Sequence, residues 1–240
     1  MLDTRSQFSN LQLPHSVYQF AIAAKGGNEL ILWTVQDVAV CKQLEETGRY
    51  TTPPERVEFP ENEDDAFNHA NYAYRWLADQ MREHVGPPPE GVVYPVWAWY
   101  KQQGQHDGKP DMRQSHYFKG KPCVRMKLDV PDWDVLLSDF DDWHHALNYW
   151  HCSLDEEDSN EFDAWRESLG VGFHDIGNWD LKSPELDLVR ARVEDSWERM
   201  LGVKPVDEHW HFPWEKRSIQ ATFWVLKRDH VISVERFVSR

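Results

Sequence analysis

Acidic, imidazole and thiol side chains gather in one short stretch in the second half of the chain. Asp141 and His145 are four residues apart, so a helix would place both on one face, where together with Asp139 they could bind a divalent metal ion. His151 and Cys152 follow closely. In the alternative interpretation the aspartates cap a helix and the histidines lie at its surface. We favour this structural interpretation, which predicts no metal. A metal-dependent hydrolase or nuclease built on Asp139, Asp141 and His145 is kept as an alternative.

A second pair of imidazoles, His209 and His211, alternates along the chain, so an extended strand would direct both to one face. No third ligand follows at a fixed spacing, and the pair alone predicts no metal site. The sequence also lacks the signatures GxSxG, GxxxxGK[ST], HExxH and GxGxxG. Their absence argues against the ordinary serine hydrolases, P-loop proteins, zincins and dinucleotide-binding folds.

The net charge and the cysteine content indicate which partners and which cellular compartment to expect. The chain of 240 residues has 41 acidic and 26 basic side chains, a net charge of −15 and a pI of about 5.2. Such a field disfavours a nucleic-acid partner, although a local basic groove is compatible with one. Three cysteines without a CxxC pair indicate a reducing compartment. No apolar run approaches the length of about 20 residues that spans a membrane, so we expect a cytoplasmic protein without a membrane partner.

Aromatic and aliphatic residues alternate in the middle of the chain. In an extended strand Trp97 and Trp99 point to one face, and Val96, Ala98 and Tyr100 point to the other. Both faces are apolar, which predicts a central strand covered on both sides. Tryptophans are numerous, 13 in all, and could stack on a sugar or a base, but large aromatic residues dominate protein cores and we favour that role. The same alternatives apply to Trp133, Trp143 and Trp150.

The order of predicted elements indicates an α+β fold with a mostly antiparallel central sheet flanked by helices. Strands are predicted at 29–35, 96–100, 123–130, 219–226 and 231–238, the last two forming a hairpin that turns at 227–230. Helices are predicted at 37–47, 65–85, 138–150, 162–169 and 183–201. Residues 1–28 are predicted to be an N-terminal extension and 29–240 a single domain, which contains a long polar loop over 101–122.

Five segments together resemble a bacterial family of uncharacterised proteins that is known only as a domain of unknown function. The segments are Trp33–Gln36 (WTVQ), Tyr94–Tyr100 (YPVWAWY), Lys109–Arg113 (KPDMR), Leu137–Asp141 (LSDFD) and Gln220–Trp224 (QATFW). The resemblance extends over roughly residues 30–240. It implies membership of that family and supplies no activity.

More distantly, the order of elements resembles the ADP-ribosyltransferase fold. The strand Leu32–Thr34 and the helix ending at Leu44–Gly48 look like the first strand and helix of those enzymes, and 219–237 looks like their late pair of strands. The His or Arg of their first strand is not evident here, and Gln220 stands where they carry a catalytic Glu. A neutral amide can hydrogen-bond a ribose hydroxyl, but it cannot act as a carboxylate base or stabilise an oxocarbenium ion by charge.

This resemblance implies an NAD-binding, ADP-ribosyltransferase-like domain with NAD as its cofactor. The implied roles are a groove lined by Trp33, Thr34 and Gln36, Tyr100 stacking on nicotinamide, Gln220 holding ribose, and Arg113 or Arg125 meeting the pyrophosphate through a planar donor fork. Tyr100 and Gln220 are the positions that would carry catalysis. Each of these residues also has a structural interpretation, as part of a core, a strand, a helix cap or a solvated sheet face.

A non-enzymatic acidic protein-interaction module is the main alternative. The acidic segment Asp155–Asp158 is predicted to be a loop that meets a basic protein partner. Reversing its charges would abolish capture of that partner if this interpretation is right. A nucleotide ligand and a protein partner are therefore the two partner classes that the sequence favours.

Overall fold

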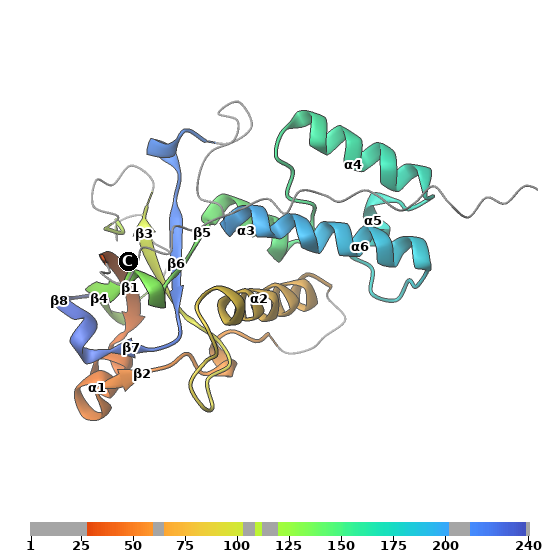
Figure 1. Ribbon diagram of the computed structural model, residues 1–240. Coiled ribbons are helices and arrows are strands. Elements are labelled where there is room, and N and C mark those ends of the chain that lie inside the picture. Colours follow the sequence, from red (N-terminus) through yellow and green to blue (C-terminus); the bar gives the residue numbers. More distant parts are fainter. Residues whose placement is uncertain (1–27, 60–64, 103–108, 112–119, 202–211, 239–240) are drawn as a thin grey trace, which may run out of the picture.

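The chain folds around a six-stranded antiparallel sheet in which strands distant in sequence lie side by side. The computed structural model describes residues 28–59, 65–102, 109–111, 120–201 and 212–238. The strand order is β5-β6-β3-β1-β4-β8, and every neighbouring pair is antiparallel (Figure 1). The strands are β1 (Glu29–Asp37), β3 (Val96–Lys101), β4 (Pro122–Pro131), β5 (Leu136–Asp139), β6 (Ile219–Phe223) and β8 (Val231–Val238). A separate two-stranded sheet joins β2 (Arg49–Tyr50) and β7 (Leu226–Lys227).

Among the residues that the structure describes, six α-helices accompany the sheet, which confirms the predicted α+β class. They are α1 (Val38–Thr47), α2 (Asp65–His84), α3 (Phe140–Leu147), α4 (Glu156–Ser168), α5 (Phe173–Ile176) and α6 (Pro184–Ser196). The short 3-10 helices are η1 (Pro54–Arg56), η2 (Asp132–Asp134), η3 (Trp197–Leu201), η4 (Trp214–Lys216) and η5 (Arg228–His230). In Figure 1, α3 to α6 extend together beyond the β5 edge of the sheet, whereas α1 lies near the small sheet of β2 and β7. Within the described ranges, no helix is both long and apolar enough to cross a membrane.

Two hydrophobic cores form because the strands alternate their side chains between the two faces of the sheet. One core lies under α1, β2 and β7 and contains Val96 and Ala98, with Tyr100 packed against it. The other contains residues of α2, α3 and α6, and Trp97 packs against it. The alternation predicted for β3, with apolar cover on both faces, is therefore what the structure shows.

The predicted C-terminal hairpin is wrong. β6 lies between β5 and β3, and β8 pairs with β4 at the opposite edge of the sheet. All five residues of β6 are buried, which suits a strand with neighbours on both sides, whereas no residue of the edge strand β8 is buried. The segment between them is η5, and β7 pairs with β2. Two apolar runs joined by a short polar segment look locally like a hairpin. The buried run nevertheless takes a position inside the sheet, and the exposed run takes a position at its edge.

The predicted acidic loop at Asp155–Asp158 is also wrong, because these residues begin α4. The Asp155 carboxylate accepts a hydrogen bond from the Asp158 amide at 2.9 Å and so caps the helix. The following acids then lie in the first turn, where the helix dipole favours negative charge. Residues 1–27 of the predicted N-terminal extension and the histidines at 209 and 211 lie outside the described residues.

One buried histidine makes the fold sensitive to acid. The His230 ring is buried, and its Nδ1 accepts a hydrogen bond from the Lys227 amide at 3.4 Å. Burial and the nearby Lys227 ammonium lower the pKa of His230. The unfolded chain therefore takes up this proton first as the pH falls below about 6.5, and folding stability decreases in that range.

We expect the free energy of unfolding, measured by urea titration from pH 8 to pH 5, to fall toward the acid end. His230→Phe keeps an aromatic ring in the core but removes the titrating group, so its pH dependence should be shallower than that of the parent. An equal dependence in both proteins would contradict this assignment.

Candidate functional site

A small pocket opens where β1 and β3 separate. Their register pairs Trp33 with Trp99, and beyond this pair the Thr34 hydroxyl donates to the Trp97 carbonyl at 2.8 Å. The Gln36 amide in turn donates to the Thr34 hydroxyl at 2.9 Å. The Thr34 hydroxyl thus connects β1 to β3 beyond the Trp33–Trp99 pair, and a pocket of about 200 Å³ lies here.

Aromatic rings form much of the pocket wall. Trp97 and Trp143 lie with ring centroids 5.3 Å apart, and Tyr74 lies 5.9 Å from Trp97 and 5.5 Å from Trp143. Trp99 and Gln220, which are paired across β3 and β6, complete the lining together with Thr34 and Gln36. A pocket with this lining suits a planar ring that carries polar substituents.

Two residues of the lining each have a buried polar atom that lacks a hydrogen-bond partner among the described residues. These atoms are the Gln220 Oε1 atom, an acceptor, and the Trp97 Nε1 atom, a donor. An unpaired buried polar group costs roughly 1–3 kcal/mol, so a native structure that keeps two in one pocket calls for an explanation. A ligand that offers one donor and one acceptor would satisfy both.

Basic side chains surround Trp33, beside the pocket. The cationic groups of Lys109, Arg125 and Lys127 lie 5.1, 5.9 and 5.7 Å from the centre of its indole ring. Glu235 binds both Lys109 and Arg125, and these hydrogen bonds lower the pKa of its carboxyl group. Lys109, Arg125 and Lys127 thus gather basic groups on this rim in a chain whose net charge is −15.

The structure brings together three of the predicted site residues and separates others. Thr34, Gln36 and Gln220 line one pocket. Tyr100 packs against the core on the α1 side, away from Trp97 and its aromatic partners. Trp33 is buried at the basic rim. Arg125 donates to the Pro110 carbonyl at 2.5 Å and pairs with Glu235. Arg113 lies outside the described residues.

Sequence analysis favoured a core role for Trp97, Trp99 and Trp143, and it did not single out Tyr74. The structure places all four in the pocket lining. The alternation of β3 was a usable signal for two of them. Trp97 and Trp99 lie on the face opposite Tyr100, and Gln220, which pairs with Trp99, lies on the same face as the two tryptophans.

Asp139 has a structural role at the start of α3. Its Oδ1 atom accepts hydrogen bonds from the amides of Asp141 at 2.8 Å and Asp142 at 3.1 Å, and its Oδ2 atom accepts one from Arg217 Nε at 2.7 Å. Arg217 also lies 3.6 Å from the Asp142 carboxylate. Burial and the neighbouring Asp142 raise the pKa of Asp139, against the lowering effect of Arg217 and the backbone amides.

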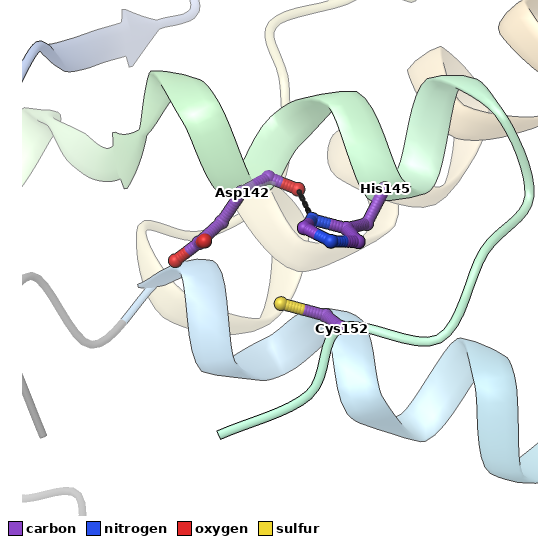
Figure 2. Close-up of side chains that lie close together, drawn as sticks. All are labelled: Asp142, His145 and Cys152. Atoms are coloured by element: carbon purple, nitrogen blue, oxygen red, sulfur yellow. Dashed lines mark hydrogen bonds between the residues drawn. The ribbon is translucent and has the colours of Figure 1, made fainter. Parts of the chain in front are cut away.

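Both oxygens of Asp139 are therefore engaged, and the predicted grouping of Asp139 and Asp141 with His145 does not form. His145 instead lies beside Asp142 and Cys152 (Figure 2). Asp142 belongs to the same acidic stretch but was not chosen as a ligand, although its spacing of three residues from His145 was a usable signal.

The acidic stretch at the start of α4 is partly structural as well. Asp158 accepts hydrogen bonds from Arg199 Nη1 at 2.5 Å and from the Leu154 amide at 3.0 Å. Burial acts to raise the pKa of Asp158, but these hydrogen bonds outweigh it and lower that pKa. With Asp155 acting as the cap, Glu156 and Glu157 are the members of this stretch with exposed side chains, and a protein partner there stays a prediction.

The chain belongs to a family described as a domain of unknown function, DUF3841, whose model matches residues 31–232. This match confirms the predicted membership of an uncharacterised family. No curated protein and no solved structure matches the chain. The resemblance to ADP-ribosyltransferases therefore stays a prediction.

The buried ion pair at α3 gives a direct test of this geometry. Arg217→Met would leave the buried carboxylates of Asp139 and Asp142 without their cation, so we expect the free energy of unfolding to fall by about 3–5 kcal/mol. The matched control is Arg75→Met, because Arg75 lies 3.6 Å from Glu58 with its side chain 58% exposed. Its loss should stay within about 1 kcal/mol. Urea unfolding that gives equal losses for both variants would show that Arg217 does not anchor α3.

Proposed function

We propose that this domain binds NAD, with the nicotinamide ring in the pocket between β1 and β3. The observation that carries the proposal is the pair of unpartnered buried atoms in an aromatic wall, Gln220 Oε1 and Trp97 Nε1. The primary carboxamide of nicotinamide offers an N–H donor for the first and a carbonyl acceptor for the second. Its planar ring suits the surrounding rings of Tyr74 and Trp143.

The size of the pocket limits what it takes. Its volume of about 200 Å³ is below the roughly 300–1,000 Å³ of sites for drug-sized ligands, so one ring enters and the rest of a dinucleotide lies outside. The basic rim of Lys109, Arg125 and Lys127 is next to the pocket, because Val35 in the lining pairs with Arg125 in the sheet. Charge-assisted hydrogen bonds from such side chains suit a pyrophosphate.

The proposal concerns binding rather than group transfer. Cleaving the bond between nicotinamide and ribose develops positive charge on the sugar, which a nearby carboxylate would stabilise. Gln220 stands at the position where the resemblance would place that carboxylate, and its amide carries no charge. It supplies a hydrogen-bond acceptor, so it contributes to recognition of the ligand.

Calorimetric titration with NAD, nicotinamide and ADP-ribose tests the proposal. We expect micromolar binding of NAD and weaker binding of nicotinamide. Gln220→Leu removes the acceptor at little cost in volume, and affinity for both ligands should fall about tenfold, the effect of losing one hydrogen bond of roughly 1.4 kcal/mol.

Tyr100→Leu is the matched control, because Tyr100 packs on the other face of the sheet and its loss should leave NAD affinity unchanged. Loss of binding in this variant, with Gln220→Leu unaffected, would favour stacking on Tyr100 instead. A folded parent protein that binds none of the three ligands would rule out the proposal.

A further inference from the structure

Three side chains with metal-binding atoms converge on the inner side of α3, away from the pocket between β1 and β3. Asp142 and His145 lie one helical turn apart on α3, and Cys152 lies in the segment that follows the helix. One ligand atom from each lies within 4.8 Å of the other two (Figure 2). Asp142 and Cys152 are buried and His145 is half-buried, so the group sits below the surface and reaches it through the imidazole.

The backbone conformation after α3 brings Cys152 back beside that helix. After α3 ends, Tyr149 adopts a left-handed conformation with a φ of 56°, which is uncommon for a residue other than glycine and reverses the chain. The Cys152 amide then donates to the Ser196 hydroxyl at 2.9 Å, and its carbonyl accepts from Arg199 Nη1 at 2.7 Å. These two contacts fix the position of the sulfur beside α3.

A hydrogen bond also determines the tautomer of the His145 imidazole. His145 Nδ1 lies 3.2 Å from the Asp142 carbonyl oxygen, which can only accept a hydrogen bond. The proton therefore sits on Nδ1, and Nε2 carries the lone pair. A histidine that donates one ring N–H to a backbone carbonyl and presents the other nitrogen is the usual arrangement in metal sites. Figure 2 shows this second nitrogen on the side of the ring that faces Cys152.

The charges around the group are compatible with a cation. Arg217 contacts the two buried carboxylates of Asp139 and Asp142. Buried carboxylates are costly unless positive charge compensates them. A divalent ion bound to a Cys152 thiolate would add one net positive charge beside Asp142.

We propose that Asp142, His145 and Cys152 bind a zinc ion, through a carboxylate oxygen, Nε2 and Sγ. Thiolate, imidazole and carboxylate are the three ligand types that zinc takes in proteins, and the thiolate disfavours magnesium, calcium and manganese. Bonds of about 2.0–2.3 Å in a tetrahedron place ligand atoms roughly 3.3–3.8 Å apart, so the side chains draw together modestly around the ion. Three protein ligands leave a fourth position open.

His145 is the member of the group that also lines a cavity. His145 borders a cavity of about 470 Å³ whose lining includes His151, Phe162 and Tyr149. The His151 ring stacks on Phe162 with centroids 4.0 Å apart, and its buried Nε2 atom has no hydrogen-bond partner among the described residues. Catalytic zinc sites have three protein ligands and an open position, whereas structural sites are closed by four protein ligands.

The test uses the full chain, purified without a metal-affinity tag, stripped with chelator and titrated with Zn²⁺ by calorimetry and with Co²⁺ by absorption spectroscopy. We expect one ion per chain and a thiolate-to-cobalt charge-transfer band. Cys152→Ser should abolish the band, and His145→Ala should weaken zinc binding by more than about tenfold, the loss that outer-shell partners alone can cause.

Two matched controls should keep the band and the zinc affinity: Cys41→Ser, a buried thiol on α1, and His144→Ala, the exposed neighbour of His145 on the same helix. Circular dichroism checks that each variant is folded. If Cys152→Ser unfolds, the half-buried His145→Ala carries the test. Absence of stoichiometric binding by the parent, or zinc affinity unchanged in His145→Ala, would overturn the proposal, and neither result depends on whether the domain binds NAD.

Discussion

The ion pair between Asp139 and Arg217 is the interaction on which both candidate sites depend. Asp139 is the last residue of β5 and the cap of α3, so one carboxylate fixes where the chain leaves the sheet and in which direction the helix starts. Its partner Arg217 precedes β6, the strand next to β5. The start of α3 is thereby tied to the neighbouring strand, and the position of everything that α3 carries follows from that connection.

One short helix consequently serves two regions. Trp143 belongs to the aromatic wall beside β3, whereas Asp142 and His145 face the return segment with Cys152. A shift of α3 by a fraction of a turn would open the aromatic wall and move Asp142 and His145 away from Cys152. Protein interiors are close-packed and resist such shifts, which is why a buried pair of opposite charges at the base of the helix has effects at a distance.

Local pattern and local chemistry account for what the sequence predicted well. The alternation of β3, the Asp37 cap of α1 and the long amphipathic α2 depend on neighbours within one or two turns of the chain. Gln220, Thr34 and Gln36 were chosen from a resemblance, and they do line one pocket.

The errors have a common physical origin in contacts between segments far apart in sequence. Nothing local to Asp139 reveals Arg217, which lies 78 residues further along the chain. The placement of Cys152 beside α3 depends on Tyr149, whose left-handed backbone no sequence pattern announces. The false hairpin arose in the same way, because its two strands satisfy a local rule while their true neighbours β3 and β4 belong to the first half of the domain.

The position of β6 has a consequence for how the chain folds during its synthesis on the ribosome. β6 is inserted between two strands made earlier, β5 and β3. Until residues 219–223 leave the exit tunnel, the nascent chain holds unpaired strand edges and an incomplete core, a state that is slow to resolve and open to association with other chains. The pocket that Gln220 lines can therefore form only after β6 has been synthesised, long after β1 and β3.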